Sequence, residues 1–222
     1  MKNKLTQIQY AVIPKQLTTS NDLTLLDEHG YEGLNIEKKD FSGKTLYNLK
    51  FYECQLNNVN FRQTKITDVR FTNVKFEDCD LANLKLEKAL VERAEFIKCR
   101  MTGLKIIEGG LKNILFKNCQ LKLSQFRFSK FKNITFEHCL LEEADFYGAD
   151  LTGTIFSDSD LTKAEMSASK LKGVDFRTSK ITGLSANIES LKGAIIDPTQ
   201  INDLAWLLGL KIEWKGQNDR SQ

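Results

Sequence analysis

Cysteine is the residue type whose spacing first suggests chemistry in this chain. There are five cysteines among 222 residues, and Cys79, Cys99, Cys119 and Cys139 recur every twenty positions. Thiolates bind metals, form disulfides and act as nucleophiles. An odd number of cysteines argues against a disulfide framework, and the chain lacks the CxxC pairs typical of zinc sites. We therefore expect neither a metal nor a cofactor.

All five cysteines, Cys54 included, lie two residues before a large apolar residue, in a position otherwise filled by small side chains. Residues two apart on an extended chain point to the same side, so the thiols are expected to point inward. A thiol buried among apolar groups is unreactive because its pKa is raised. Core packing is the expected role. A thiol enzyme or redox sensor would require these thiols to react in the native protein.

The remaining candidates for catalysis are two histidines and a pair of acids. His29 and His138 have no Ser or Cys nucleophile beside them, and no glycine-rich phosphate loop is present. Glu142 and Glu143 are neighbours on a turn, so they cannot act as acid and base across a cleft. The sequence predicts that the protein is not an enzyme and has no catalytic residues.

An apolar residue at every fifth position organises most of the chain. From Ile36 to Ile181, thirty consecutive positions at this spacing are Phe, Leu, Ile, Val or Met, and of fourteen phenylalanines only Phe128 is out of phase. Helices have a period of 3.6 and strands of 2, so neither explains it. Three extended residues followed by a tight turn would wind the chain into an all-β solenoid, in which stacked units bury their apolar faces.

A second period of twenty residues sets the number of sides. The positions that show it are Phe76, Phe96, Phe116, Phe136, Phe156 and Phe176. Identical residues at this interval predict vertical stacks, and hence four five-residue sides in each coil. Residues 36–181 would then form about seven coils.

The stretch EADFYGADLTGTIFSDSDLTKAEM resembles the A(D/N)LxX pattern of the pentapeptide-repeat family. This resemblance implies a right-handed quadrilateral β-helix. We expect an amino-terminal cap at 1–35, the pentapeptide-repeat β-helix at 36–184, a carboxyl-terminal capping and dimerisation module at 185–215, and a flexible tail at 216–222.

Both ends of a solenoid need a cap. Ser20 could begin a short helix that ends at Gly30 and covers the first coil. At the other end, Asp197 is an expected helix cap, with Pro198 at the first helical position, Gln200 at the third, and a stop at Gly209.

The carboxyl-terminal helix has an apolar stripe with two interpretations. It consists of Ile201, Leu204, Ala205 and Leu208, with Trp206 and Leu207 on its flank. The stripe could cap the last coil, form a dimer contact, or do both. Residues 210–214 (LKIEW) are expected to form a short closing strand.

The segment LKGAIIDPTQINDLAWLLGLKIE also resembles the carboxyl-terminal module of Qnr-type pentapeptide proteins. That resemblance implies a homodimer joined tail to tail. It also implies a type II topoisomerase, DNA gyrase or topoisomerase IV, as the partner. Qnr-type proteins protect these enzymes from quinolones and are thought to imitate the shape and charge of duplex DNA.

The net charge of +3 departs from that of a DNA mimic, but the charges are segregated. Residues 84–133 carry twelve Lys or Arg against four Glu, a net of +8, and residues 137–165 carry eight acids against one Lys, a net of −7. Four sides per coil would place Glu142, Glu143, Asp145, Asp160 and Glu165 on two adjacent sides. Together with Asp150 they form the expected partner-binding surface, the acidic corner. Such clustering also arises by drift on the polar outside of a solenoid.

One side of each coil is expected to be basic. Its cations are Lys50, Arg70, Arg93, Lys112, Lys130, Lys132, Lys170 and Lys172, which outnumber Glu53, Glu92 and Asp150. Such a side could meet nucleic acid or an acidic protein, although a lysine-rich side is often simply solvated. No reading motif accompanies it, and Tyr52 is its main aromatic residue. Direct nucleic-acid binding is therefore a minor alternative.

The leading hypothesis is a Qnr-like interaction rod that binds a type II topoisomerase through the acidic corner. The rival is a structural or scaffold protein with an unrelated protein partner. The repeat register is unbroken, so no loop is expected to project toward gyrase, and inhibition is expected as readily as protection. No apolar run is long enough to span a membrane and no signal peptide is evident, so the expected location is the cytoplasm.

Overall fold

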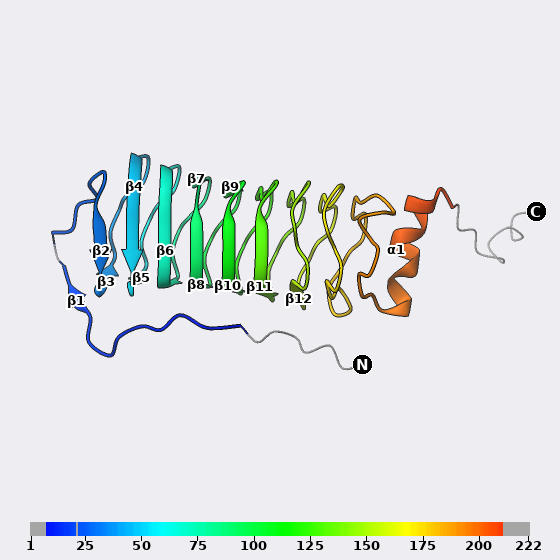
Figure 1. Ribbon diagram of the computed structural model, residues 1–222, viewed down its shortest axis with the longest axis horizontal. Helices are drawn as coiled ribbons and strands as arrows, with labels where there is room; N and C mark the ends of the chain where they lie inside the picture. Colours follow the sequence, from blue (N-terminus) through cyan, green and yellow to red (C-terminus); the bar gives the residue numbers. More distant parts are fainter. Residues whose placement is uncertain (1–7, 21, 211–222) are drawn as a thin grey trace, which may run out of the picture.

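The five-residue spacing places every large apolar residue of the repeat inside a parallel β-solenoid (Figure 1). The computed structural model describes residues 8–20 and 22–210. Residues twenty apart pair in register, as Phe96 does with Phe116 and Phe116 with Phe136. Each coil is therefore twenty residues long, and the expected solenoid fold is confirmed.

Each coil has four sides, which we name A to D in chain order. In the coil at 114–133 their central residues are Phe116 on side A, Leu121 on B, Phe126 on C and Phe131 on D, and all four are buried. A residue twenty positions away lies on the same side of the next coil. The residue two before the central one also points inward, and the other three positions carry the outward side chains.

The described residues form twelve strands, which are β1 (Thr18–Thr19), β2 (Gly30–Glu32), β3 (Leu34–Glu37), β4 (Thr45–Tyr52), β5 (Gln55–Asn57), β6 (Lys65–Glu77), β7 (Lys85–Glu87), β8 (Leu90–Ile97), β9 (Lys105–Ile107), β10 (Gly110–Lys117), β11 (Lys130–Glu137) and β12 (Ile155–Ser157). Seven of these twelve described strands have two to four residues, whereas β4, β6, β8, β10 and β11 continue through one or two corners. Later coils are joined by single bridges, such as Asp145 to Glu165.

Most corners are formed by the residue two after the central one, which adopts a left-handed backbone. Its φ is 54° at Asn58, 55° at Asn118 and 67° at Gly148. Asparagine and glycine tolerate this region, whereas most other residues are strained there by about 1–2 kcal/mol. Other corners carry residues such as Lys88 and Leu123 in the same conformation, so the stacking of the coils also imposes these bends.

The core is a set of vertical ladders. On side A, the rings of Phe96 and Phe116 are 5.0 Å apart at 10°, and those of Phe116 and Phe136 are 4.7 Å apart at 5°. Parallel rings in register bury large apolar area at each step along the rod. This repeated burial holds adjacent coils together.

The expected helix between Ser20 and Gly30 is wrong. Gly30–Glu32 instead forms β2, which pairs with β4, and the ring of Tyr31 stacks on that of Phe51 at 5.0 Å. Tyr31 is in phase with the repeat, so a further rung buries its ring directly against the ladder. Residues 22–29, which precede this rung, contain turns and no helix.

The residues before β1 follow the outside of the rod (Figure 1). The backbone N–H of Ala11 donates to Glu95 Oε1 at 3.2 Å, and that of Val12 donates to Asn73 Oδ1 at 3.4 Å. The backbone N–H of Gln9 donates to Asn113 Oδ1 at 3.5 Å. Leu115, an outward residue two positions after Asn113, is only 8% exposed. This segment therefore lies along the corner between sides D and A.

The carboxyl-terminal end is closed by a composite helix: a 3₁₀ turn at Pro198–Gln200, α1 (Ile201–Ala205) and a second 3₁₀ turn at Trp206–Leu208. The expected capping box is confirmed, because Thr199 N donates to Asp197 Oδ1 at 2.9 Å and Asp197 N to Gln200 Oε1 at 2.8 Å. Gly209 ends the helix with φ of 70°.

Most of the expected closing strand at 210–214, and the expected tail at 216–222, lie outside the described residues. Within residues 8–20 and 22–210, no helix is long and apolar enough to cross a membrane.

Candidate functional surfaces

The cysteines lie inside the rod, as their spacing predicts. All five are free and buried. On side B, Cys119 Sγ donates to Phe96 O at 3.2 Å, and Cys139 Sγ donates to Phe116 O at 3.4 Å. Burial raises the pKa of Cys54, and the neighbouring thiols together with burial raise that of Cys99. These thiols pack the core and bond to the backbone of the preceding coil.

Neither histidine lies in a cluster of catalytic or metal-binding side chains among the described residues. His138 occupies an exposed corner, with Nε2 4.0 Å from Glu137 Oε1. The ring of His29 packs edge-on against Tyr31 at 4.8 Å. Across the described part of the chain, no group of three or more His, Cys, Asp or Glu side chains could hold a metal ion.

The acidic corner extends over three sides of the rod. Glu142, Glu143 and Asp160 lie on side B, and Asp145 and Glu165 are bridged neighbours on side C. These five occupy adjoining sides, as the sequence analysis expected. Asp150 lies on side D of the same coil as Asp145, bridged to Lys130 and Lys170.

Four of the six corner acids contact a cation of a neighbouring coil. The pairs are Glu142 with Lys122, Asp145 Oδ2 with Arg127 Nε at 2.5 Å, Asp150 Oδ2 with Lys170 Nζ at 3.2 Å, and Asp160 Oδ2 with Lys180 Nζ at 3.4 Å. Sequence reasoning missed these pairs, although opposite charges twenty residues apart were the signal for three of them; Arg127 and Asp145 are eighteen residues apart. The pairs reduce the negative charge that the corner presents to a partner.

Hydrogen bonds favour the charged form of three corner carboxylates, those of Asp150, Asp160 and Glu165. Burial alone would raise the pKa of Asp150, but bonds from Thr152 and Lys170 lower it below its usual value. Asp160 behaves in the same way, with Thr162 as its main partner. The pKa of Glu165 is lowered by Ser167 against a similar burial effect.

The residues expected to cap the rod or form a dimer divide into two groups. Leu204 and Ala205 are buried against the last coil, to which Gln200 Nε2 also donates at 2.8 Å to Phe176 O. Ile201 and Trp206 are 54% and 50% exposed. The Leu208 side chain lies outside the described part. The structure thus separates a packed capping face from an exposed apolar face.

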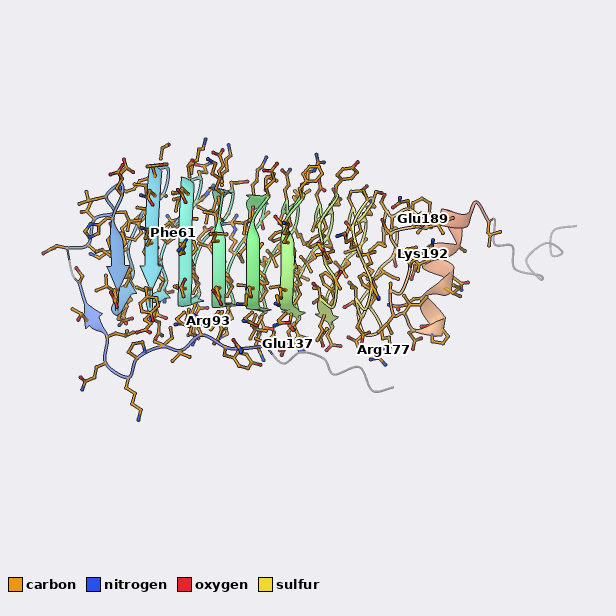
Figure 2. All side chains as sticks on the ribbon, viewed as in Figure 1. Phe61, Arg93, Glu137, Arg177, Glu189 and Lys192 are labelled. Atoms are coloured by element: carbon orange, nitrogen blue, oxygen red, sulfur yellow. The ribbon has the colours of Figure 1, made fainter. Side chains whose placement is uncertain are left out.

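The basic side is side D. Arg93 lies at its edge, where Nε donates to Asn73 Oδ1 at 2.7 Å and Nη1 to Glu92 Oε1 at 2.8 Å (Figure 2). Other cations surround a hollow over Leu90 and Gly110. Sequence reasoning missed the hollow, although Gly110 marks an outward position at which a side chain is absent.

Comparisons with known structures give distant likenesses. HetL, a pentapeptide repeat protein involved in heterocyst differentiation regulation from the cyanobacterium Nostoc sp. strain PCC 7120, is 17% identical, with 77% of this chain and 90% of HetL covered and a TM-score of 0.35. Full-length QnrB1, a plasmid-mediated fluoroquinolone resistance protein, is 18% identical, with 82% and 99% covered and a TM-score of 0.30. A trypsin-treated QnrB1 variant is 19% identical, with 83% and 100% covered and a TM-score of 0.37.

No curated protein sequence matches the chain. The family described as "Pentapeptide repeat region" matches residues 69–146 and 129–206, and the one described as "Pentapeptide repeats (8 copies)" matches residues 46–83. These matches cover more than half of the chain and fall on the coils themselves, so the chain belongs to the pentapeptide repeat family.

Proposed function

We propose that this chain is a non-catalytic, Qnr-like interaction rod that binds DNA gyrase or topoisomerase IV by partial DNA mimicry and modulates quinolone action. The acidic corner carries this proposal. Its carboxylates recur along adjoining sides of a straight rod, where they can substitute for DNA phosphates in a basic channel. The sequence resemblance of the carboxyl-terminal segment to the Qnr-type module supplies the partner class.

The ion pairs of the corner make the mimicry partial. Lys122–Glu142 and Arg127–Asp145 are partly exposed pairs. Such pairs contribute only about 0–1 kcal/mol each, so exchange of Lys122 for a lysine or arginine of the enzyme costs little. The rod would act by competing with DNA or by remodelling the enzyme–DNA–drug complex.

The proposed assembly is a homodimer joined through Ile201 and Trp206, the exposed apolar residues of the carboxyl-terminal end. Such a dimer would bring two acidic corners toward the centre of a longer rod. We place this interaction in the cytoplasm.

DNA supercoiling by purified gyrase, with increasing amounts of this protein and with or without a quinolone, tests the proposal. Inhibition alone, or rescue from the drug, is the expected result. No effect in either arm from a folded protein would contradict it.

A neutralised acidic corner tests the mechanism. Glu142→Gln, Glu143→Gln and Asp145→Asn together remove three negative charges and keep side-chain shape. The matched control, Asp68→Asn, Glu87→Gln and Glu108→Gln, removes three acids from the basic half of the rod. We expect the first variant to lose its effect on gyrase and the control to keep it. Equal activity of both would argue against mimicry by this corner.

A structural or scaffold role with an unrelated protein partner is the second candidate. The observation that favours it is that four of the six corner acids already have a cation of this chain beside them. Failure of both supercoiling arms would leave this role as the better explanation.

A further inference from the structure

Side D carries a basic-rimmed hollow in the amino-terminal half of the rod. In one column of outward residues, Arg70 pairs with Leu90, Leu90 with Gly110, and Gly110 with Lys130. This stretch of the column thus has a cation at each end, with an apolar residue and a missing side chain between them. The column continues to Lys50 before Arg70 and to Asp150 after Lys130. Lys112 and Lys132 lie beside this column and also line the hollow.

The hollow exists because a side chain is absent at Gly110. A Cβ there would lie 3.0 Å from Leu90 Cδ2, so a side chain at this position would displace the leucine that forms the floor. The preceding Gly109 is a packing residue, since a Cβ at that position would lie 2.4 Å from Ile106 Cγ2. Leu90 remains 48% exposed on the floor of the hollow.

The rim carries uncompensated positive charge. Lys112 Nζ donates to Glu92 Oε1 at 2.8 Å, and Arg93 shares the same carboxylate. No ion pair joins Arg70, Lys130 or Lys132 to an acid within the described part of the chain. Three cations therefore surround an apolar floor, which favours a ligand that is anionic at its ends and apolar in its middle.

We propose that this hollow binds an acidic peptide segment of a protein partner, in which an apolar residue lies between two carboxylates. Coils repeat at about 4.8 Å, so Arg70 and Lys130, three coils apart, are separated by about 14 Å. Residues i and i+4 of an extended peptide lie about 13 Å apart on one face, with i+2 between them. A Glu-x-Leu-x-Glu segment laid along the rod would reach both cations and place its leucine over Gly110. This site is distinct from the acidic residues of sides B and C, and of the acidic corner only Asp150 lies on side D, next to Lys130. Its peptide-binding test does not depend on the topoisomerase proposal.

Nucleic acid fits the hollow less well. None of its described lining residues is aromatic, so bases have no stacking surface. Glu92 lies on the rim, and the apolar floor offers nothing to phosphates. The observations favour the peptide.

Fluorescence anisotropy with labelled peptides and the full chain tests the proposal. The probe is the labelled peptide Gly-Ser-Glu-Ser-Leu-Ser-Glu-Ser-Gly, and the matched probe has serine in place of leucine. We expect the leucine peptide to bind about tenfold more tightly, and both to weaken with salt. A labelled 20-base-pair DNA duplex, about two helical turns, is the third probe.

Variants on side D identify the site. Lys132→Glu is expected to weaken binding of the leucine peptide about tenfold or more, whereas Lys172→Glu, two coils away in the same column, leaves it unchanged. Gly110→Val fills the hollow and is expected to bring the affinities of the two peptides together. Circular dichroism verifies that each variant is folded.

Three results would overturn the proposal. These are equal or absent binding of the two peptides, equal effects of Lys132→Glu and Lys172→Glu, and tighter binding of the duplex than of the leucine peptide. The last result would assign the hollow to nucleic acid.

Discussion

At the scale of single residues, the inward position two before each central residue carries several buried hydroxyl groups. Some of them donate a hydrogen bond, and others have no hydrogen-bond partner among the described residues. Thr64 Oγ1 donates to Phe41 O at 2.7 Å, and Ser169 Oγ donates to Phe146 O at 2.6 Å. Thr154 Oγ1 is buried with no partner among the described residues. A buried hydroxyl group without a partner loses its bonds to water and gains nothing, so it destabilises the fold.

The substitution Thr154→Val is expected to raise the free energy of unfolding by about 1 kcal/mol, because it removes an unsatisfied hydroxyl and keeps the shape. The matched substitution Thr64→Val should lower it by about 1 kcal/mol, because the Phe41 carbonyl loses its donor. Urea unfolding followed by circular dichroism measures both. The same sign for the two variants would refute this account.

Phe128 is the one phenylalanine outside the repeat phase, and it occupies a left-handed corner with φ of 57°. Its ring covers Gly148, where a Cβ would lie 2.6 Å from Phe128 Cδ1, whereas Gly153 has open space. Both glycines have positive φ, so alanine is strained at either position. We expect Gly153→Ala to lower the free energy of unfolding by about 1 kcal/mol and Gly148→Ala to lower it by about 2 kcal/mol.

In a chain that carries Phe128→Asn, Gly148→Ala should destabilise the fold no more than Gly153→Ala does. The reason is that asparagine tolerates the corner and leaves room for the methyl group. Thermal unfolding of the four proteins of this cycle gives the coupling energy. Strictly additive effects would show that the ring does not require this glycine.

At the scale of elements, the carboxyl-terminal helix has one buried and one exposed apolar face. Leu204 is 8% exposed against the last coil, whereas Ile201 and Trp206 lie on the outside. Solenoid ends are stabilised by a cap that covers their apolar face. We therefore expect substitutions on the buried face to lower stability and substitutions on the exposed face to affect the proposed association.

Leu204→Asp is expected to lower the free energy of unfolding by about 2–4 kcal/mol, since it buries a charge on the coil end. Ile201→Asp and Trp206→Asp should each change it by less than about 0.5 kcal/mol and convert a dimer to a monomer. Light scattering after size-exclusion chromatography measures the mass. An unchanged mass for both outer variants would exclude a dimer through this face.

At the scale of the whole molecule, the charges form a vertical network between coils. Lys117 Nζ contacts Glu137 Oε1 at 2.7 Å, and Lys112 Nζ contacts Glu92 Oε1 at 2.8 Å, each across one coil spacing (Glu137, Figure 2). Exposed pairs of this kind are individually weak. Their number ties the stability of the rod to the ionisation of its carboxylates.

Acid is expected to destabilise the rod. Hydrogen bonds, opposed by burial, lower the pKa values of Asp150 and Asp160 below those of the unfolded chain, and Arg177 lowers that of Asp175. A carboxylate with a depressed pKa stabilises the fold above its unfolded pKa, and this stability is lost as pH falls through its folded pKa. Thermal midpoints should therefore fall steadily below about pH 4.

Circular dichroism melts between pH 7 and pH 3 measure this effect. A variant carrying Asp150→Asn, Asp160→Asn and Asp175→Asn should show a shallower decline than the unmodified chain. Parallel curves would mean that these carboxylates do not link pH to stability.

The sequence by itself determined the coil and its period. Burial in a solenoid repeats locally, so the phase of Phe96, Phe116 and Phe136 was sufficient to place them inside. The capping box at Asp197 could also be read directly, because its hydrogen bonds join residues three positions apart.

Only the tertiary structure decided which outward side chains contact one another and how the amino-terminal residues pack against the rod. Whether Glu142 meets Lys122, or whether Gly110 leaves a hollow between Arg70 and Lys130, depends on side chains brought together by stacking of coils. Tyr31 extends the aromatic ladder because its ring stacks on that of Phe51 in the next coil. The segment at 8–12 has no repeat of its own. Its position depends on hydrogen bonds to side chains of the coils, such as those of Glu95 and Asn73.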